Sequence, residues 1–187
     1  MKKFFIIILS LVLTLTIQAQ GKPASFMGIP VSGSSNSMHE ALTKKGFKKN
    51  YYGTYNGKYL GRDVTVHFVT NSKGEVWRLL VVYGRADYEL GDGLLDFDKE
   101  CRAIAIYNEC LNKLLADKNL KKEKAYGPIS YKEDEAIYSE LNKNPRSEKY
   151  SAHFLQGGQQ SAQQWMRLLK SDDGYVISVF FDSVSNK

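Results

Sequence analysis

Two groups of strand-like segments, each preceded by a helical pattern, limit the folds open to this chain more than any other feature. The six segments occupy positions 47–55, 58–69, 75–83, 148–156, 162–170 and 174–183. Alternation of apolar and polar residues with a period of two is typical of strands that bury one face. Short turn-like links join neighbouring segments and favour antiparallel pairing. We therefore predict an α+β fold built on an antiparallel sheet of about six strands.

Helical patterns precede both groups of strands. Ser35 or Ser37 caps a short helix over 37–45, and Gly46 ends it. A longer helix over 94–117 carries one apolar stripe through Ile104 and Leu111 and a second through Tyr107 and Leu114. A helix that covers a sheet buries one stripe, so the second stripe needs another cover: the N-terminal segment, another helix or a partner chain. We expect the helices on one face of the sheet.

A weak internal repeat connects the two groups of strands. The echoed segments are Val66-His67-Phe68-Val69 with Trp77-Arg78-Leu79-Leu80, and Ala152-His153-Phe154-Leu155 with Trp165-Met166-Arg167-Leu168-Leu169. Hairpin pairing would set Phe68 opposite Trp77 and His153 opposite Arg167, with Phe154 beside Trp165. Cross-strand aromatic pairs of this kind stabilise a register by about 0.2–1 kcal/mol each. The repeat predicts two related units, 35–83 and 94–183, each a helix followed by antiparallel strands.

The first twenty residues have the layout of a secretory signal peptide. Lys2 and Lys3 precede an apolar run over 4–17, and the small-residue junction at 18–20 follows it. The run is shorter than the roughly 20 apolar residues that a membrane span needs. We expect residues 1–19 to be removed, which an intact mass would show, leaving one domain over 20–187 with no transmembrane span. The expected location is periplasmic or secreted.

Two cysteines, Cys101 and Cys110, lie nine residues apart within the longer helical pattern. That spacing separates them by about 13.5 Å on nearly opposite faces of a helix. A disulfide needs Cα atoms within about 7 Å, so no bond between them is expected. Two interpretations stay open: both residues are small buried apolar groups, or Cys110 faces a partner chain in a homodimer formed through this helix.

Charge and motifs narrow the classes of function. The formal net charge of +6 falls to +4 once Lys2 and Lys3 are removed, a mild excess that does not indicate nucleic acid binding. The sequence has neither a Gly-x-Ser-x-Gly nor an HExxH motif, and its acidic residues between 87 and 98 lack the spacing of a calcium loop. The sequence therefore predicts no catalytic residue, no metal site and no cofactor.

The strongest surface signal is a tyrosine-rich hairpin, with a tight turn predicted at Asn56-Gly57. Its candidate binding residues are Tyr51, Tyr52, Tyr55, Tyr59, Lys58 and Arg62, and further lysines stand at 44, 45, 48 and 49. Tyrosine combines a rigid apolar ring with a polar tip, and neighbouring lysines attract anionic groups. This composition suits the recognition of a sugar, a peptide or another protein.

The sequence thus predicts an exported, non-enzymatic binding module that recognises a protein or glycan of the cell envelope through an exposed sheet face and this hairpin. Two alternatives stay open. A small envelope hydrolase would show clustered His, Asp or Ser side chains in a deep pocket. An envelope structural or assembly factor is the third interpretation.

Two resemblances accompany this reading. The segments Phe26-Met27-Gly28-Ile29-Pro30, Lys45-Gly46-Phe47 and Tyr175-Val176-Ile177-Ser178-Val179-Phe180-Phe181-Asp182 resemble those of small exported bacterial proteins of unassigned function. The layout of a helix followed by a meander resembles the helix-then-sheet modules of the β-lactamase inhibitory protein and outer-membrane assembly lipoprotein type. The second likeness implies a fold and no catalytic residue. The chain departs from the lipoprotein pattern because no cysteine follows its apolar N-terminal run.

Overall fold

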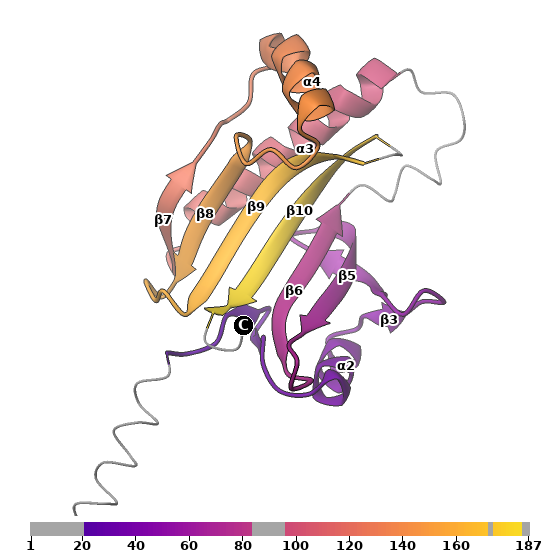
Figure 1. The fold of residues 1–187 in the computed structure, drawn as a ribbon, viewed down its shortest axis with the longest axis vertical. Coiled ribbons are helices and arrows are strands. Elements are labelled where there is room, and N and C mark those ends of the chain that lie inside the picture. Colours follow the sequence, from indigo (N-terminus) through magenta and orange to yellow (C-terminus); the bar gives the residue numbers. More distant parts are fainter. Residues whose placement is uncertain (1–20, 84–95, 172–173, 185–187) are drawn as a thin grey trace, which may run out of the picture.

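The computed structural model describes residues 21–83, 96–171 and 174–184, which form an α+β structure (Figure 1). The predicted signal peptide and the acidic residues at 87–92 lie outside the described residues. The strands are β1 (Ser25–Phe26), β2 (Ile29–Pro30), β3 (Lys48–Lys49), β4 (Tyr55–Tyr59), β5 (Arg62–Thr70), β6 (Val76–Tyr83), β7 (Leu120–Ala125), β8 (Ser151–Gln156), β9 (Ala162–Ser171) and β10 (Gly174–Ser183). The helices are α2 (Ser35–Lys44), α3 (Asp96–Ala116), the 3₁₀ turn Tyr131–Glu133 and α4 (Asp134–Lys143).

Eight strands form one antiparallel sheet in the spatial order β3-β4-β5-β6-β10-β9-β8-β7, while β1 and β2 form a separate hairpin. The order is symmetric about the central pair of β6 and β10, which are hydrogen-bonded from Ile177 opposite Tyr83 to Asp182 opposite Arg78. Each half of the sheet has four strands in chain order after a helix, α2 in one half and α3 in the other, and in the second half α4 is inserted between β7 and β8. The predicted α+β class and antiparallel sheet are confirmed.

Each helix begins or packs for a local reason. The Ser34 hydroxyl accepts the Ser37 N–H at 3.2 Å and caps α2, which buries Met38 and Leu42. Figure 1 shows α3 passing behind β8, β9 and β10. Its buried side chains are Ala103, Ile104, Tyr107, Cys110, Leu111 and Leu114. These residues form one broad face, so the two predicted stripes merge. The sheet covers this face together with the segment after β7, where Gly127 lies against Tyr107 and Leu111.

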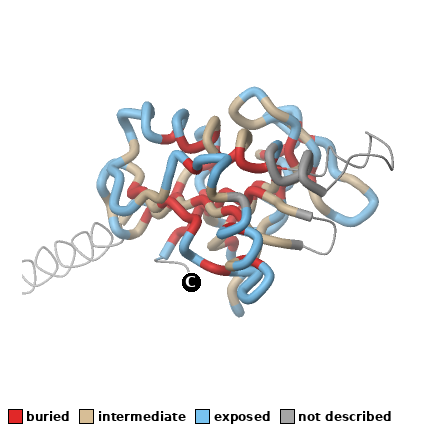
Figure 2. The backbone as a smooth tube through the Cα atoms, turned by 90° about the horizontal axis from the view of Figure 1, so that it is seen from above, coloured by how far each residue is buried: buried red, intermediate tan, exposed pale blue. Residues whose placement is uncertain are grey.

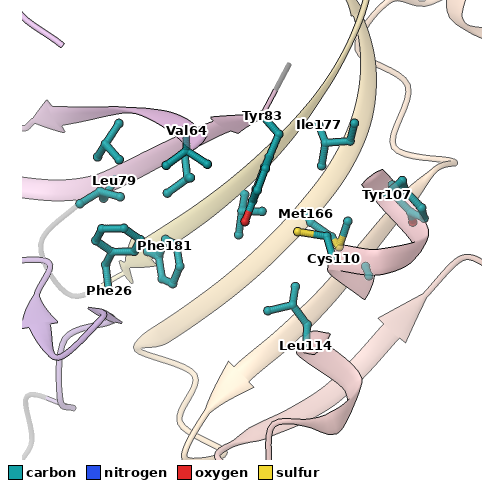
Figure 3. Close-up of a cluster of buried hydrophobic side chains, with 14 of the residues drawn as sticks. Phe26, Val64, Leu79, Tyr83, Tyr107, Cys110, Leu114, Met166, Ile177 and Phe181 are labelled. Carbon is teal, nitrogen blue, oxygen red and sulfur yellow. The ribbon is translucent and has the colours of Figure 1, made fainter. Parts of the chain in front are cut away.

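The core lies between the helices and one face of the sheet. In Figure 2 the buried residues run through the middle of the molecule, and exposed segments lie outside them. Val66, Val81, Val179 and Met166 point into this core from neighbouring strands, and all four are completely buried. In Figure 3 the side chains of α3 meet those of the strands within this cluster. Burial of such side chains is the main source of fold stability.

Cys110 belongs to this core. It is a free cysteine, only 3% exposed, and lies beside Met166 (Figure 3). Burial raises the pKa of its thiol to about 11, so the group stays protonated. The prediction that Cys101 and Cys110 form no disulfide is confirmed. The first interpretation of Cys110 holds, because its side chain faces the core and is not available to a partner chain.

The sheet has two more strands than the predicted six. The segment predicted at 47–55 divides into β3 and the start of β4, separated by a turn. β7 was missing from the prediction because Leu120–Ala125 is mostly charged and follows α3 closely. As the edge strand of the sheet, β7 needs only one pairing partner and carries lysines, which protect an exposed edge.

The turn predicted at Asn56-Gly57 was wrong. The two-residue turn lies at Leu60-Gly61, where φ is +51° and +83°, and Tyr59 pairs with Arg62 across it. Gly57 lies inside β4 for another reason. A Cβ atom at this position would overlap the ring of Phe47, so the glycine makes room for an aromatic side chain.

The predicted cross-strand partners were also wrong. A bulge between Val69 and Thr70 shifts the register, so Phe68 lies opposite Leu79 and not Trp77. On β9, Arg167 pairs with Ser151, because the loop between β8 and β9 is longer than expected. The echoed segments lie on β5 and β6 in one half and on β8 and β9 in the other. These strands are not equivalent in the symmetric order, so only the layout of the elements repeats.

Candidate functional site

The predicted binding residues of the tyrosine-rich hairpin do not share one surface. Tyr55 is 2% exposed and its hydroxyl lies 3.0 Å from Nδ1 of His39 on α2. Tyr59 packs on Phe26 and Phe181 in the core, and burial raises its pKa. The contact surface predicted for four tyrosines therefore narrows to two, Tyr51 and Tyr52, which lie in the exposed turn between β3 and β4.

The two predicted cations of this hairpin form ion pairs. Lys58 lies 3.4 Å from Asp63 across the β4–β5 pair, with both side chains mostly exposed. Arg62 donates from Nε to Glu109 of α3 at 2.8 Å, and hydrogen bonds from Arg62 and Lys113 lower the pKa of this carboxyl group. Arg62 therefore ties the β4–β5 turn to a helix.

The sheet face opposite the helices carries a different group of side chains, and we call it the open face. α2, α3 and α4 all contribute to the core cluster on the other side of the sheet. Phe180 is 6% exposed yet does not belong to that cluster, because alternation along β10 turns it to the open face. Facing Phe180 across the neighbouring strands are Leu80 of β6 and Trp165 of β9.

Three rings form a continuous stack across the open face, and we call them the aromatic row: His153, Trp165 and Phe180. Trp165 pairs with Phe180 on one side and with His153 on the other. Its ring is nearly parallel to both, with centroid distances of 3.8 Å to Phe180 and 5.5 Å to His153. Both faces of the indole are therefore covered, and its edge is the part that a ligand can reach.

Two arginines flank the aromatic row. The guanidinium carbon of Arg78 lies 5.7 Å from the Trp165 ring and 5.2 Å from the Phe180 ring, and that of Arg167 lies 5.2 Å and 5.4 Å from the same rings. These distances are those of cation–π contacts. Trp77 adds a further ring 4.5 Å from Arg78. The arginines thus hold the row in place from both sides.

The two arginines differ in their partners. Arg78 donates two hydrogen bonds to Asp182, at 2.7 Å and 2.6 Å, and Trp165 Nε1 donates to the same carboxylate at 3.2 Å. Arg167 donates from Nη1 to the carbonyl of Arg146 at 3.3 Å, while its buried Nε has no hydrogen-bond partner in the described residues. Burial lowers the pKa of Arg167, but an arginine stays charged at neutral pH. The buried Nε is out of reach of a partner, but Nη2 makes no hydrogen bond within the described residues, so Arg167 keeps donors for an incoming acceptor.

His153 and Ser151 form the serine–histidine contact that a hydrolase would require, at 3.2 Å between Oγ and Nε2. Ser151 is completely buried, and its hydroxyl donates to the carbonyl of Glu148 at 2.6 Å. With that proton committed, the imidazole donates to the serine oxygen and does not accept from it. The arrangement therefore lacks the geometry of an activated nucleophile.

Within the described residues, the remaining titratable side chains do not gather into a metal centre. His39 lies on α2, whereas His67 and His153 stand on β5 and β8 with three strands between them. Throughout the described ranges, no three His, Cys, Asp or Glu side chains are close enough to hold a metal ion. Within the same part of the chain, no helix has the length and apolar character needed to cross a membrane.

Comparison of the chain with protein-family models, with curated proteins and with solved structures found no match.

The sequence analysis did not identify the residues of the open face, although the sequence contains a signal for some of them. Trp165 and Arg167 alternate with the apolar residues Met166 and Leu168 along β9, which places them on the opposite side from the core. The stack also needs Phe180, which lies in a run of seven buried residues on β10 where alternation is hidden. Only the pairing register shows that these residues meet.

Proposed function

We propose that the protein is a non-enzymatic binding module whose open face recognises a partner protein that presents a carboxylate. The observation that carries this proposal is Arg167, a cation with unused donors held against two aromatic rings. Interface residues that contribute most to affinity are enriched in tryptophan and arginine, in rigid and well-packed settings. The aromatic row supplies such a setting before any partner arrives, which reduces the entropy lost on binding.

Charge on the open face favours an acidic partner. Two carboxylates of this face, Asp63 and Asp182, are paired with cations of the same face, while those of Glu123 and Glu148 lie near enough to His153 to raise its pKa slightly against the effect of burial. Arg167 of β9 and the exposed Lys121 and Lys124 of β7 outnumber these two remaining carboxylates and leave a small excess of positive charge. Such an excess steers an acidic partner to this face and speeds association.

A protein partner fits the open face better than a glycan does. Sugars are recognised by stacking on the face of an aromatic ring, and both faces of Trp165 are covered by His153 and Phe180. The exposed features of the row are ring edges and guanidinium donors, which suit a carboxylate and its neighbouring side chains.

The test places a photo-reactive residue at Gln163, next to the row on the open face, or at Leu115, on the exposed side of α3. We expect a specific cross-linked partner from position 163 in the source cells and none from 115. With that partner purified, Arg167→Met should weaken binding by about 30-fold, the loss typical of a central interface arginine.

The matched control is Lys118→Met, which removes one exposed cation outside the open face and should leave the affinity within about twofold. Equal cross-linking from positions 163 and 115, or an unchanged affinity for folded Arg167→Met, would contradict the proposal.

A further inference from the structure

The turn between β3 and β4, away from the open face, presents two tyrosines to solvent. Tyr51 is 97% exposed and Tyr52 is 78% exposed, the largest exposed fractions of any large apolar side chain in the described residues. Their rings contact each other edge to face at 5.6 Å. Large apolar side chains rarely stay this exposed in pairs unless they contact another surface.

The turn is held in place by its own hydrogen bonds. The side-chain oxygen of Asn50 accepts the N–H groups of Tyr52 and Thr54, each at 3.1 Å, and its amide donates to the Thr54 hydroxyl at 2.7 Å. Gly53 supplies the positive φ of +79° that closes the turn. The tyrosines are therefore displayed by a preformed structure, and binding costs little ordering entropy.

Four lysines surround the tyrosines: Lys44 and Lys45 at the end of α2, and Lys48 and Lys49 in β3. All four are exposed, and none forms an ion pair with a carboxylate of the described residues. Residues 41–62 contain no Asp or Glu at all. This end of the molecule is thus a concentrated cationic surface with an aromatic pair at its centre. We call residues 44–53 the tyrosine tip.

We propose that the tyrosine tip docks the protein on an anionic lipid surface. Tyrosine is enriched at membrane–water interfaces, where the ring lies among the headgroups and the hydroxyl stays hydrated. Unpaired lysines beside it are attracted to lipid phosphates. A two-residue projection has little area to bury against a folded protein, which usually needs about 800 Å² per partner. A headgroup layer can take in such a projection without a matching pocket.

Vesicle co-sedimentation tests this docking. The probe is a vesicle of equal parts phosphatidylglycerol and phosphatidylcholine, with pure phosphatidylcholine as the comparison. The protein begins at Gly21, because the apolar residues 4–17 would bind vesicles themselves, and this span contains every residue of the core cluster. We expect binding to the anionic vesicles that weakens with added salt.

Two sets of variants separate the contributions. Tyr51→Ser with Tyr52→Ser, and separately Lys48→Glu with Lys49→Glu, should each weaken vesicle binding about tenfold or more. The matched controls are Tyr131→Ser, an exposed tyrosine elsewhere, and Lys118→Glu with Lys122→Glu, two exposed lysines in and before β7. Both controls should bind like the parent, and all variants should keep the parent's melting temperature.

Equal binding to both kinds of vesicle, parent-like binding by the tip variants, or loss in the controls alone would overturn the proposal. So would capture of a protein or glycan through Tyr51 and Tyr52 without vesicle binding. Arg167→Met should bind vesicles like the parent, so failure of the open-face proposal leaves this one standing, and the reverse also holds.

Discussion

At the scale of single residues, Asp182 organises the open face. Its carboxylate accepts hydrogen bonds from Arg78 and Trp165, and its side chain is only 9% exposed. A buried carboxylate is costly unless it is paired, so the Asp182–Arg78 pair fixes both side chains in one geometry. Asp182 is already neutralised by Arg78, and the described carboxylate that acts on Arg167 is that of Glu148, which forms no ion pair with it.

His153 makes the stability of the aromatic row depend on pH. Burial, with a smaller effect from the nearby Lys124 ammonium, lowers the pKa of His153 below its ordinary value. The unfolded chain therefore takes up a proton at a higher pH than the folded chain does. The free energy of unfolding should fall as pH drops from above the ordinary histidine pKa of about 6.5 through the folded value, and the loss should level off below it.

The measurement is urea unfolding at several pH values between neutral and mildly acidic. His153→Phe keeps a ring in the stack and removes the titration, so its stability should change less over this window than that of the parent. His67→Phe, at an exposed position of the same face, is the control and should keep the parent's slope. A parent whose stability rises as the pH falls through this window would contradict the assignment.

At the scale of the elements, Gly57 shows how a strand adapts to its neighbour. Because a Cβ atom there would overlap the Phe47 ring, Gly57→Ala should destabilise the protein by about 2 kcal/mol, the usual range for overpacking. In a Phe47→Leu background the same substitution should cost clearly less, since the clashing ring is gone. Urea unfolding of the four proteins in this cycle gives both values.

Purely additive costs in that cycle would mean that the two residues do not compete for space. A second control, Gly53→Ala, adds a Cβ where no atom lies within 4 Å. It should cost about 1 kcal/mol through its positive φ alone, in both backgrounds.

The elements differ in how well the sequence predicts them. α3 and the strands near 62–83 and 151–183 follow clear periodicity, and their predicted ranges agree with the structure. The sequence did not predict β7, because an edge strand needs no apolar face. It predicted a turn at Asn56-Gly57 wrongly, because this glycine makes room for packing inside a strand. The open face could be predicted only in part. The alternation of apolar and polar residues along β9 predicts on which face of the sheet Trp165 lies. Its contact with Phe180 depends on the strand register, which loop lengths and a bulge determine.

At the scale of the whole molecule, the two halves depend on each other. Phe26, from the start of the described chain, contacts Phe181 near its end at 5.1 Å, and the Ala24 N–H donates to the Ser183 hydroxyl at 2.8 Å. The central pairing of β6 with β10 adds a shared ladder. Neither half can complete its core without the other.

Fragments 21–83 and 84–187 should therefore each lack a cooperative unfolding transition when they are alone. Mixed in equal amounts, they should recover the circular dichroism and thermal transition of the intact chain. The melting temperature of the mixture should rise with protein concentration. A cooperative transition for fragment 21–83 by itself would show that its core is self-sufficient.

The position of β10 has a consequence for how the protein is made. β10 is the last of the eight strands along the chain, yet it has partners on both sides. Until residues 174–183 leave the ribosome, β6 and β9 each keep an unpaired edge, and such edges recruit other chains into aggregates. The nascent chain thus carries its greatest aggregation risk just before β10 emerges, when a holding chaperone would protect it most.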